Sequence, residues 1–337
     1  MTRLLSLTLT LGATLLGGVA QAAGFQAKTM RESLSAREVE RPLILGKGWL
    51  EFGLGTDLKL ANGEWDADGN RVSWDDASWM YSTQRLGLRY GITRRGELYW
   101  TIKTHFVRLQ NDALSTDISQ FGLGDPSFGY KYELFRSLAP LSSVIVYGDY
   151  KGPAANESPG NYVGGPYSFS SVILTTGTPD ARIGLRGKRQ IGPLAGELGF
   201  AYTRRLSQVV QYVVETELYQ GSGRIKPGDL TTIDGSLTVQ AGPVALNAGA
   251  IFVVRDETRI GPTAEGIFLG RDLEAVEGSG GWTLDAPVGA TFNLTRGVDL
   301  VGAVNIPLRG EDLAFFPIED IHPTYGPTYS GTVEFRY

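Results

Sequence analysis

Apolar and polar positions alternate along much of the chain. In residues 48–60, the leucines and Phe52 fall on one face, while Glu51 and Asp57 fall on the other. Residues 329–337 alternate in the same way. A period of two is typical of a β-strand with one apolar and one polar face. The pattern therefore predicts one strand at residues 48–60 and another at residues 329–337.

Between these strands the sequence repeats one unit, which consists of a strand, a tight turn, a second strand and a long loop. The tight turns contain glycine, as in Gly192-Pro193 and Gly242-Pro243. The unit occurs at about residues 79–108, 122–151, 180–206, 228–255 and 282–308. The long loops are predicted near residues 61–78, 109–121, 152–179, 207–227, 256–281 and 309–327. These hairpins, together with the first and last strands, predict about 12 strands.

An even strand number brings the last strand down antiparallel to the first, so that the sheet can close on itself. Apolar outward faces suit lipid, and closure leaves no unpaired strand edge in hydrocarbon. The sequence therefore predicts an all-β fold: a closed antiparallel transmembrane β-barrel with short periplasmic turns and long outer loops. The strand-like stretches Tyr167–Thr176 and Val209–Tyr219 fall inside outer loops. If they crossed the membrane as well, the barrel would have about 14 strands.

The last strand ends on Phe335, Arg336 and Tyr337. It resembles the closing strand of bacterial outer-membrane β-barrels. That resemblance implies that Phe335 and Tyr337 belong to the signal read by the barrel-assembly machinery, which would then be a partner of this chain.

Composition is compatible with such a barrel. Hydrophobic residues make up 42% of the 337 residues. No run of 18 apolar residues follows the first 25 positions, as a transmembrane helix would require. Cysteine is absent, which suits passage through an oxidising periplasm. The net charge of -5 argues against nucleic acid as a partner.

Residues 1–22 read as a cleaved secretory signal peptide. Arg3 is the positive start, residues 4–19 are the apolar core, and Ala20-Gln21-Ala22 is a small-x-small cleavage site. An anchor helix fits less well, because the apolar core is short and a cleavage site follows it. The signal predicts export, and with the barrel pattern it predicts an outer-membrane location.

The mature chain divides into two parts. Residues 23–47 are polar and mixed in charge, and are expected to form a periplasmic lead-in or a partial plug of the lumen. Both alternatives are open at this point. Residues 48–337 form the predicted barrel.

Strand parity places charges of both signs on the inward face. One interpretation, which we favour, is a lattice of ion pairs that braces the lumen wall. The other is a polar constriction that selects small solutes. A barrel of this size lies between filled small barrels and open porins, so a narrow channel is expected rather than a wide pore. The candidate lumen-lining residues are Arg85, Arg89, Lys103, His105, Lys131, Glu133 and Arg186.

The sequence gives little sign of an active site. An outer-membrane lipase would need a Ser–His pair on the lipid-facing wall, but His105 faces inward and His322 lies among prolines. Residues 66–70 resemble a calcium loop, yet the glycine comes too early and no bidentate glutamate follows. We therefore expect no enzyme activity, no cofactor and no metal site, with residues 66–70 forming a solvated turn.

The surface suggests contacts with the membrane. Aromatic residues near strand ends suit two interfacial girdles. The outer loops are acidic, as expected of a solvated face, although divalent bridging to lipopolysaccharide phosphates is an alternative. Outer-membrane lipid and lipopolysaccharide are the expected surroundings. The predicted girdle residues are Trp79, Tyr90, Trp100, Tyr132, Tyr202, Trp282 and Tyr337.

Three short segments carry a family resemblance. Residues 122–132, with the sequence GLGDPSFGYKY, residues 88–98 and residues 307–310 resemble motifs of the outer-membrane family named for the meta-pathway of phenol degradation. Pro126 departs from the family pattern. The resemblance implies a barrel that moves hydrophobic or aromatic compounds. We therefore expect a passive uptake channel for small solutes. The alternative is a structural or surface-binding barrel with a filled lumen.

Overall fold

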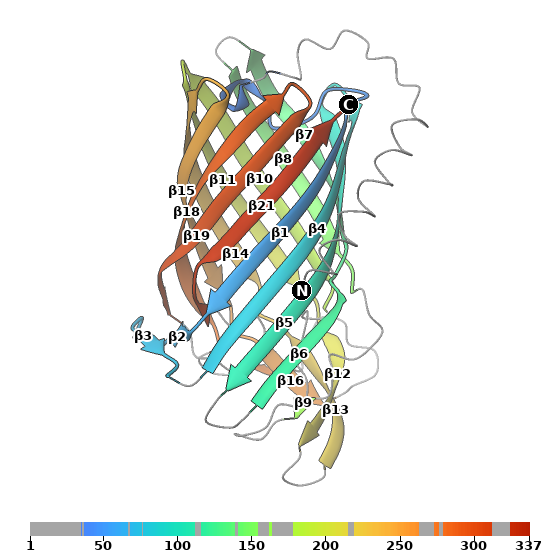
Figure 1. Ribbon diagram of the computed structural model, residues 1–337. Helices are drawn as coiled ribbons and strands as arrows, with labels where there is room; N and C mark the ends of the chain where they lie inside the picture. Colours follow the sequence, from blue (N-terminus) through green and yellow to red (C-terminus); the bar gives the residue numbers. More distant parts are fainter. Residues whose placement is uncertain are drawn as a thin grey trace.

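The computed structural model is a closed β-barrel with tight turns at one end and long connections at the other (Figure 1). We call these the turn end, at the top of Figure 1, and the loop end. The structure describes residues 35, 37–66, 68–75, 77–111, 116–138, 141–153, 162–163, 178–214, 219–262, 273–275, 279–311 and 324–337. The predicted signal peptide, His322 and the stretch Tyr167–Thr176 lie outside these residues.

Twelve strands form the ring, because the main sheet has 13 strands and one of them, β6, only continues the wall beside the far end of β5. The ring strands are β1 (Leu50–Ala61), β4 (Ala77–Thr93), β5 (Gly96–Asn111), β7 (Ser127–Leu138), β8 (Leu141–Lys151), β10 (Asp180–Ile191), β11 (Leu194–Arg205), β14 (Leu230–Ala241), β15 (Val244–Arg255), β18 (Gly281–Thr295), β19 (Val298–Glu311) and β21 (Thr328–Arg336). This confirms the predicted fold class and the lower of the two strand counts.

The first and last strands close the barrel. β1 pairs antiparallel with β21 from Glu51–Arg336 to Lys59–Thr328, and its other edge pairs with β4. The peptide groups of Leu50 and Tyr337 continue the ladder by exchanging two hydrogen bonds, of 3.0 and 2.9 Å. Closure pairs the backbone edges that a bilayer could not solvate. The predicted pairing of the two terminal strands is confirmed.

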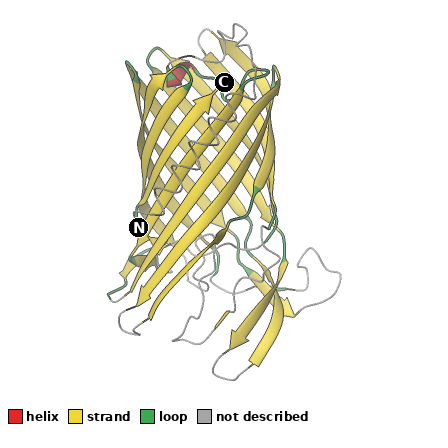
Figure 2. Ribbon diagram, turned by 45° about the vertical axis from the view of Figure 1, so that its right-hand side comes forward, coloured by secondary structure: helices red, strands yellow, loops and turns green. Residues whose placement is uncertain are grey.

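The extra strand-like stretch belongs to a separate layer at the loop end. β12 (Gln208–Val214) and β13 (Tyr219–Lys226) form a hairpin that projects beyond the barrel (Figure 2). With β9 (Tyr162–Val163), β16 (Arg259–Pro262) and β17 (Glu274–Ala275) it makes a 5-stranded sheet. A smaller sheet joins β2 (Gly63–Trp65), β3 (Arg71–Ser73) and β20 (Thr324–Tyr325). The predicted outer loops therefore contain short sheets of their own.

One predicted loop is mostly strand. The segment expected as loop 109–121 includes the end of β5 and most of β6 (Thr116–Leu123), which pair with each other. Gly124–Pro126 then interrupts the strand, and β7 resumes on the same edge of β5 nearer the turn end. The interruption requires glycine at its first position, because a Cβ at Gly124 would lie 2.2 Å from Nε2 of His105.

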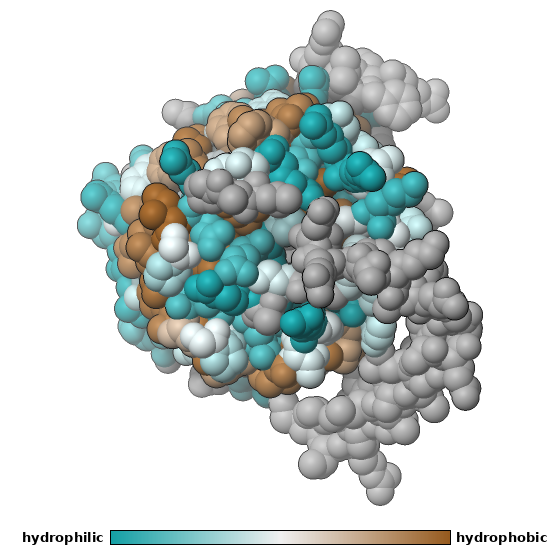
Figure 3. All heavy atoms as spheres, turned by 90° about the horizontal axis from the view of Figure 1, so that it is seen from above, coloured by the Kyte–Doolittle hydropathy of each residue, from teal (hydrophilic) through white to brown (hydrophobic). Residues whose placement is uncertain are grey.

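Side chains sort by parity between the two faces of the wall. Outward positions such as Leu198, Leu237 and Phe292 are exposed and apolar. Inward positions such as Glu97 and Asp299 are polar and fully buried. Figure 3, seen from the turn end, shows hydrophilic residues in the middle and a hydrophobic rim around them. This is the arrangement of a barrel whose outer face meets lipid and whose lumen is polar.

One predicted girdle residue, Trp79, faces the lumen instead. Its side chain is 3% exposed and packs with Ala61 and Val107, which lie on the inward face of neighbouring strands. Its parity matches that of Arg85 and Arg89, so the prediction from its position near a strand end was wrong. The described helical structure is limited to η1 (Glu38–Glu40), and no helix in this part of the chain is long and apolar enough to span a bilayer.

Two of the tight turns share one construction. Gly192-Pro193 and Gly242-Pro243 are two-residue turns, and each glycine has φ of +61°. Glycine in the first central position fits a type II′ turn, whose twist matches that of a hairpin. In both turns a glutamine two residues earlier donates its side-chain N–H to the glycine carbonyl, at 3.0 Å from Gln190 and 2.8 Å from Gln240.

Replacing Gly192 should destabilise the barrel through backbone strain alone. A Cβ at Gly192 would meet no atom within 4 Å, so φ is the only obstacle. We expect Gly192→Val to lower the free energy of unfolding by about 1–2 kcal/mol, the penalty for a left-handed L-residue. Urea unfolding in lipid vesicles measures this. The control is Gly187→Val on β10, the strand that leads into this turn, where a Cβ also has open space. An equal effect of both substitutions would contradict the prediction.

Candidate functional site

The turn end of the lumen holds a continuous network of ion pairs, which we call the turn-end network: Glu51, Arg89, Glu97, Lys131, Asp299 and Arg336. Arg89 lies 2.6 Å from Glu51 and 2.8 Å from Glu97, and Lys131 adds a contact of 2.9 Å to Glu97. Arg336 pairs with both Glu51 and Asp299. Because these residues come from β1, β4, β5, β7, β19 and β21, the network braces half of the ring.

The segment 37–47 crosses the barrel at this level. Arg41 pairs with Asp299 on β19, and the backbone N–H of Leu45 donates to Glu97 on β5 at 2.7 Å. The N–H of Glu38 donates to Gln240 on β14 at 2.8 Å, and its carbonyl accepts from Lys188 on β10 at 3.1 Å. These strands are spread around the ring, so the segment spans its cross-section.

The segment is packed as well as bonded. Val39 and Ile44 are buried, and the side chain of Arg41 is 7% exposed. Glu38 and Glu40 hold Arg41 and Arg37 through ion pairs of 2.7 and 2.6 Å. An ordered segment held in this way narrows the lumen at the turn end.

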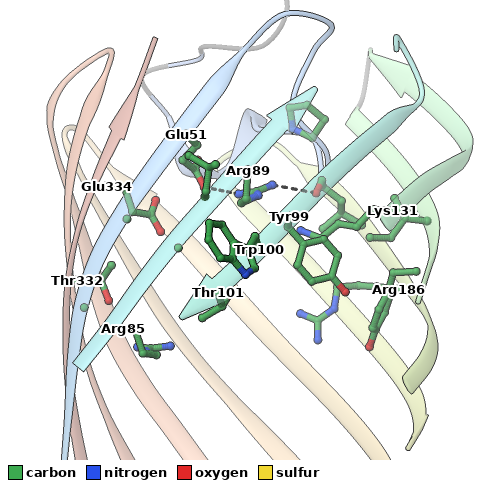
Figure 4. Close-up of a pocket in the computed structure, with 18 of the residues that line it drawn as sticks. Glu51, Arg85, Arg89, Tyr99, Trp100, Thr101, Lys131, Arg186, Thr332 and Glu334 are labelled. Atoms are coloured by element: carbon green, nitrogen blue, oxygen red, sulfur yellow. Dashed lines mark hydrogen bonds and ion pairs between the residues drawn. The ribbon is translucent and has the colours of Figure 1, made fainter. Parts of the chain in front are cut away.

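On the loop side of this segment lies a cavity of about 570 Å³. We call it the lumen cavity. The cavity is bounded at the turn end by Glu38, Pro42 and Leu43. Its wall comes from β1, β4, β5, β7, β8, β10, β11 and β21. Figure 4 shows Arg85, Arg89, Tyr99, Lys131 and Arg186 around this space. The volume matches that of sites for small organic molecules.

Glycine keeps the cavity open. Gly53, Gly55 and Gly87 occupy inward positions on β1 and β4, and a Cβ at Gly87 would come no nearer to another residue than 4.0 Å. Elsewhere glycine makes room for tyrosine rings against the wall. A Cβ at Gly129 would lie 2.3 Å from the ring of Tyr99.

The ring of Tyr147 is placed in the same way. A Cβ at Gly184 would lie 2.3 Å from Cζ of Tyr147. Both rings therefore lie along the wall rather than across the lumen, and both line the cavity.

The predicted lumen residues divide into two groups. Arg85, Arg89, Lys131 and Arg186 line the cavity. Three others face inward but do not line the cavity. They are Lys103, which pairs with Arg85 in the strand register, His105 and Glu133.

His105 and Glu133 are both buried in hydrogen-bonded positions. The hydroxyls of Tyr81 and Thr83 each lie 2.9 Å from Nδ1 of His105. Glu133 accepts a hydrogen bond of 2.7 Å from Ser143 and pairs with Arg136 at 2.6 Å. These contacts give both residues a role in packing the wall.

Several further residues line the cavity. Tyr99 and Tyr147 have inward parity, but an aromatic residue in an alternating strand suits either face, so parity alone does not single them out. Arg182 also lines the cavity, and its charge and inward parity are the sequence signal that marks it. The inward glycines carry no charge that would mark them, and residues 38–43 belong to the segment expected as a lead-in or partial plug.

The described residues hold no group of three or more His, Cys, Asp or Glu side chains placed to bind a metal. In the loop 66–70, Asp66 accepts hydrogen bonds from the N–H groups of Asn70, at 2.7 Å, and Asp68, at 3.0 Å. These bonds hold the pKa of Asp66 below its usual value, and the bond from Asn70 has the largest effect. The carboxylate thus shapes a tight turn.

No protein-family model and no curated protein matches this sequence. The structure is similar to the crystal structure of an outer membrane channel from Pseudomonas putida F1, with a TM-score of 0.63 and 14% identity over 89% of this chain and 98% of that one. The TodX monoaromatic hydrocarbon channel, as its deltaS2 mutant, has a TM-score of 0.39 and 11% identity over 86% and 90%. For the translocator domain of the autotransporter NalP from Neisseria meningitidis the TM-score is 0.44, with 11% identity over 98% and 96%.

The similarity to the Pseudomonas channel establishes the fold, which is that of an outer-membrane β-barrel. The resemblance to the phenol-pathway family stays a prediction, since no family model confirms it.

Proposed function

We propose that this protein is a passive outer-membrane channel for small solutes, narrowed at the turn end by residues 37–47. The observation that carries the proposal is the lumen cavity, an open and charged space inside a closed barrel. Polar groups fixed along a narrow lumen select solutes by size and charge. The rings of Tyr99 and Tyr147 support the aromatic part of the predicted solute class, whereas the charged wall gives no support to purely apolar solutes.

The segment 37–47 fits the plug alternative of the sequence analysis. Its contacts reach four strands around the ring, and none of them is a covalent link. Such a segment can restrict passage while it is docked and permit it when displaced. The proposed domain division keeps residues 1–22 as the signal peptide and residues 48–337 as the barrel.

The competing function is a structural or surface-binding barrel whose lumen stays filled. The observation that favours it is the same crossing segment together with the turn-end network, because both close part of the lumen. Reconstitution in planar lipid bilayers separates the two. The channel function predicts stepwise conductance, whereas a filled barrel predicts none, even after residues 35–47 are removed.

Filling the cavity from its wall should reduce transport. Gly87→Leu would place an isobutyl side chain in the lumen cavity, where a Cβ has room. We expect single-channel conductance to fall by at least half, because the added carbons displace water along the path. Bilayer recordings measure the change.

The matched control is Gly302→Leu on β19. This glycine has outward parity, and a Cβ there meets no atom within 4 Å. Unchanged conductance in Gly87→Leu, or an equal loss in both variants, would argue that solutes do not pass this cavity.

The exposed apolar side chains of the wall support placement in the outer membrane. Lipid, lipopolysaccharide and the barrel-assembly machinery remain the proposed surroundings and partners. Phe335 lies on the outward face beside Phe52, with ring centroids 6.5 Å apart, and Tyr337 is exposed. Both positions are accessible from outside the barrel, which an assembly signal requires.

A further inference from the structure

In two of the ion pairs around the lumen cavity, the arginine side chain is more exposed than its acidic partner. Arg182 pairs with Asp149 at 2.7 Å, yet its side chain is 44% exposed and that of the aspartate 9%. Arg186 and Asp234, also 2.7 Å apart, are 33% and 20% exposed. Each pair therefore presents its guanidinium to the lumen and holds its carboxylate nearer the wall.

The Arg85–Asp57 pair repeats the arrangement on another side of the cavity, with exposures of 38% and 24%. Asp57 also accepts a hydrogen bond of 2.7 Å from Ser330, and Asp149 accepts one of 2.7 Å from Tyr99. Neighbouring hydroxyls thus hold the carboxylates in place. A solute in the cavity meets arginine N–H groups before it meets the acids behind them.

The acidic residues of the lining are also paired. Glu51 is bound by Arg89 and Arg336, and Glu197 lies 3.2 Å from Lys188. The lining itself contains more cations than acids, and Asp57, Asp149 and Asp234 behind it neutralise three of its arginines. Its charged residues are Arg85, Arg89, Lys131, Arg182, Arg186 and Lys188 against Glu38, Glu51, Glu197 and Glu334.

Aromatic rings lie beside two of these cations. The guanidinium of Arg182 lies 5.5 Å from the ring centroid of Tyr147, and Nζ of Lys131 lies 5.0 Å from that of Tyr99. Both rings line the cavity, as do the arginines. A planar solute can stack on such rings while its carboxylate receives paired N–H bonds from a guanidinium.

We infer that the lumen cavity selects small aromatic carboxylates over neutral or cationic molecules of the same size. This selectivity rests on the proposed channel function and names its solute class. The guanidinium has five N–H donors, and Arg182 directs its Nε and Nη2 toward Asp149, so donors remain for a solute carboxylate. The exposed guanidinium groups attract the anion, and the tyrosine rings contact its aromatic body.

Two measurements on the full chain test the inference. In a bilayer with a potassium chloride gradient, the reversal potential should show that chloride is more permeant than potassium. In liposome-swelling assays, benzoate should enter faster than benzyl alcohol, and benzylammonium should enter most slowly. Equal rates for the three probes, or potassium selectivity, would overturn the inference.

The double variant Arg182→Gln with Arg186→Gln should weaken the preference. One elementary charge at about 5 Å in a water-like medium changes ion partition by about fourfold, so each substitution should lower the benzoate preference by up to that factor. Arg182→Lys with Arg186→Lys should retain most of the chloride selectivity, since both charges remain. It should lose part of the benzoate preference, since lysine lacks the paired N–H fork.

The matched control is Arg108→Gln. Arg108 is 41% exposed and pairs with Asp117 at 2.6 Å, but its parity places it on the outward face of β5. It should leave selectivity unchanged, and a change as large as that of the double variant would count against the lumen arginines.

The result also separates the two levels of the proposal. A protein that conducts without anion preference retains the channel function and loses the inferred solute class. A protein that never conducts, with or without residues 35–47, loses both.

Discussion

Deleting residues 35–47 is expected to raise single-channel conductance several-fold. The segment crosses the turn end between β5, β10, β14 and β19, and its buried Val39 and Ile44 occupy space that water would otherwise fill. The barrel itself should persist, because its backbone ladder closes between β1 and β21 without the segment. Bilayer recordings and the rate of antibiotic entry into whole cells both report the change.

A deletion of equal length at the loop end is the control. Removing residues 210–222 shortens the projecting hairpin β12–β13, which belongs to the separate sheet. It should alter conductance much less than removal of residues 35–47. If the two deletions have equal effects, or if neither conducts more than the full chain, residues 37–47 do not restrict the path.

Replacing Asp299 is expected to cause the largest loss of stability of any single substitution proposed for this protein. Its carboxylate is fully buried between Arg41 and Arg336 and accepts a further bond of 2.8 Å from Asn293. Asp299→Ala leaves two arginine side chains, each 7% exposed, without this partner. Removal of one partner from a buried pair costs about 3–5 kcal/mol. Urea unfolding in vesicles measures the loss.

An exposed acid provides the comparison. Asp117 is 53% exposed and pairs with Arg108, so Asp117→Ala should change stability by no more than about 1 kcal/mol. The effect of Asp299→Ala should also shrink when residues 35–47 are absent, since Arg41 is then missing. Such non-additivity is the mark of a shared interaction. Equal effects of Asp299→Ala with and without the segment would show that Arg41 and Asp299 are not coupled.

Much of the barrel could be predicted because the alternation of apolar and polar residues within each strand shows which side chains face outward. Alternation in β1 and β21 identifies which residues point outward, and the glycine turns mark where each hairpin reverses. Strand number was ambiguous for a physical reason. The sequence of β12 is strand-like, but whether a strand crosses lipid depends on which sheet it joins, and that is a tertiary property.

Only part of the candidate site could be predicted from the sequence. Charge and parity together identified Arg85, Arg89, Lys131 and Arg186, because a charge on a membrane strand has to face inward. Parity alone would also have placed Tyr99 in the lumen, yet an aromatic ring suits either face. The segment 37–47 has no periodicity at all. Its position depends on contacts such as Arg41 with Asp299, which join residues 258 positions apart.

Closure between β1 and β21 also has a kinetic meaning. Every other pairing in the ring joins strands that follow one another along the ring and the chain, so these hairpins can form from local contacts. The pairing of Glu51 with Arg336 spans 285 positions, and it has the highest entropy of loop closure. The pairing of β1 with β21 should therefore be the last and slowest step of folding. Glu51 and Arg336 are also members of the turn-end network. The network is thus complete only when the barrel has closed, which makes an intact charge pattern in the lumen a property of the finished fold alone.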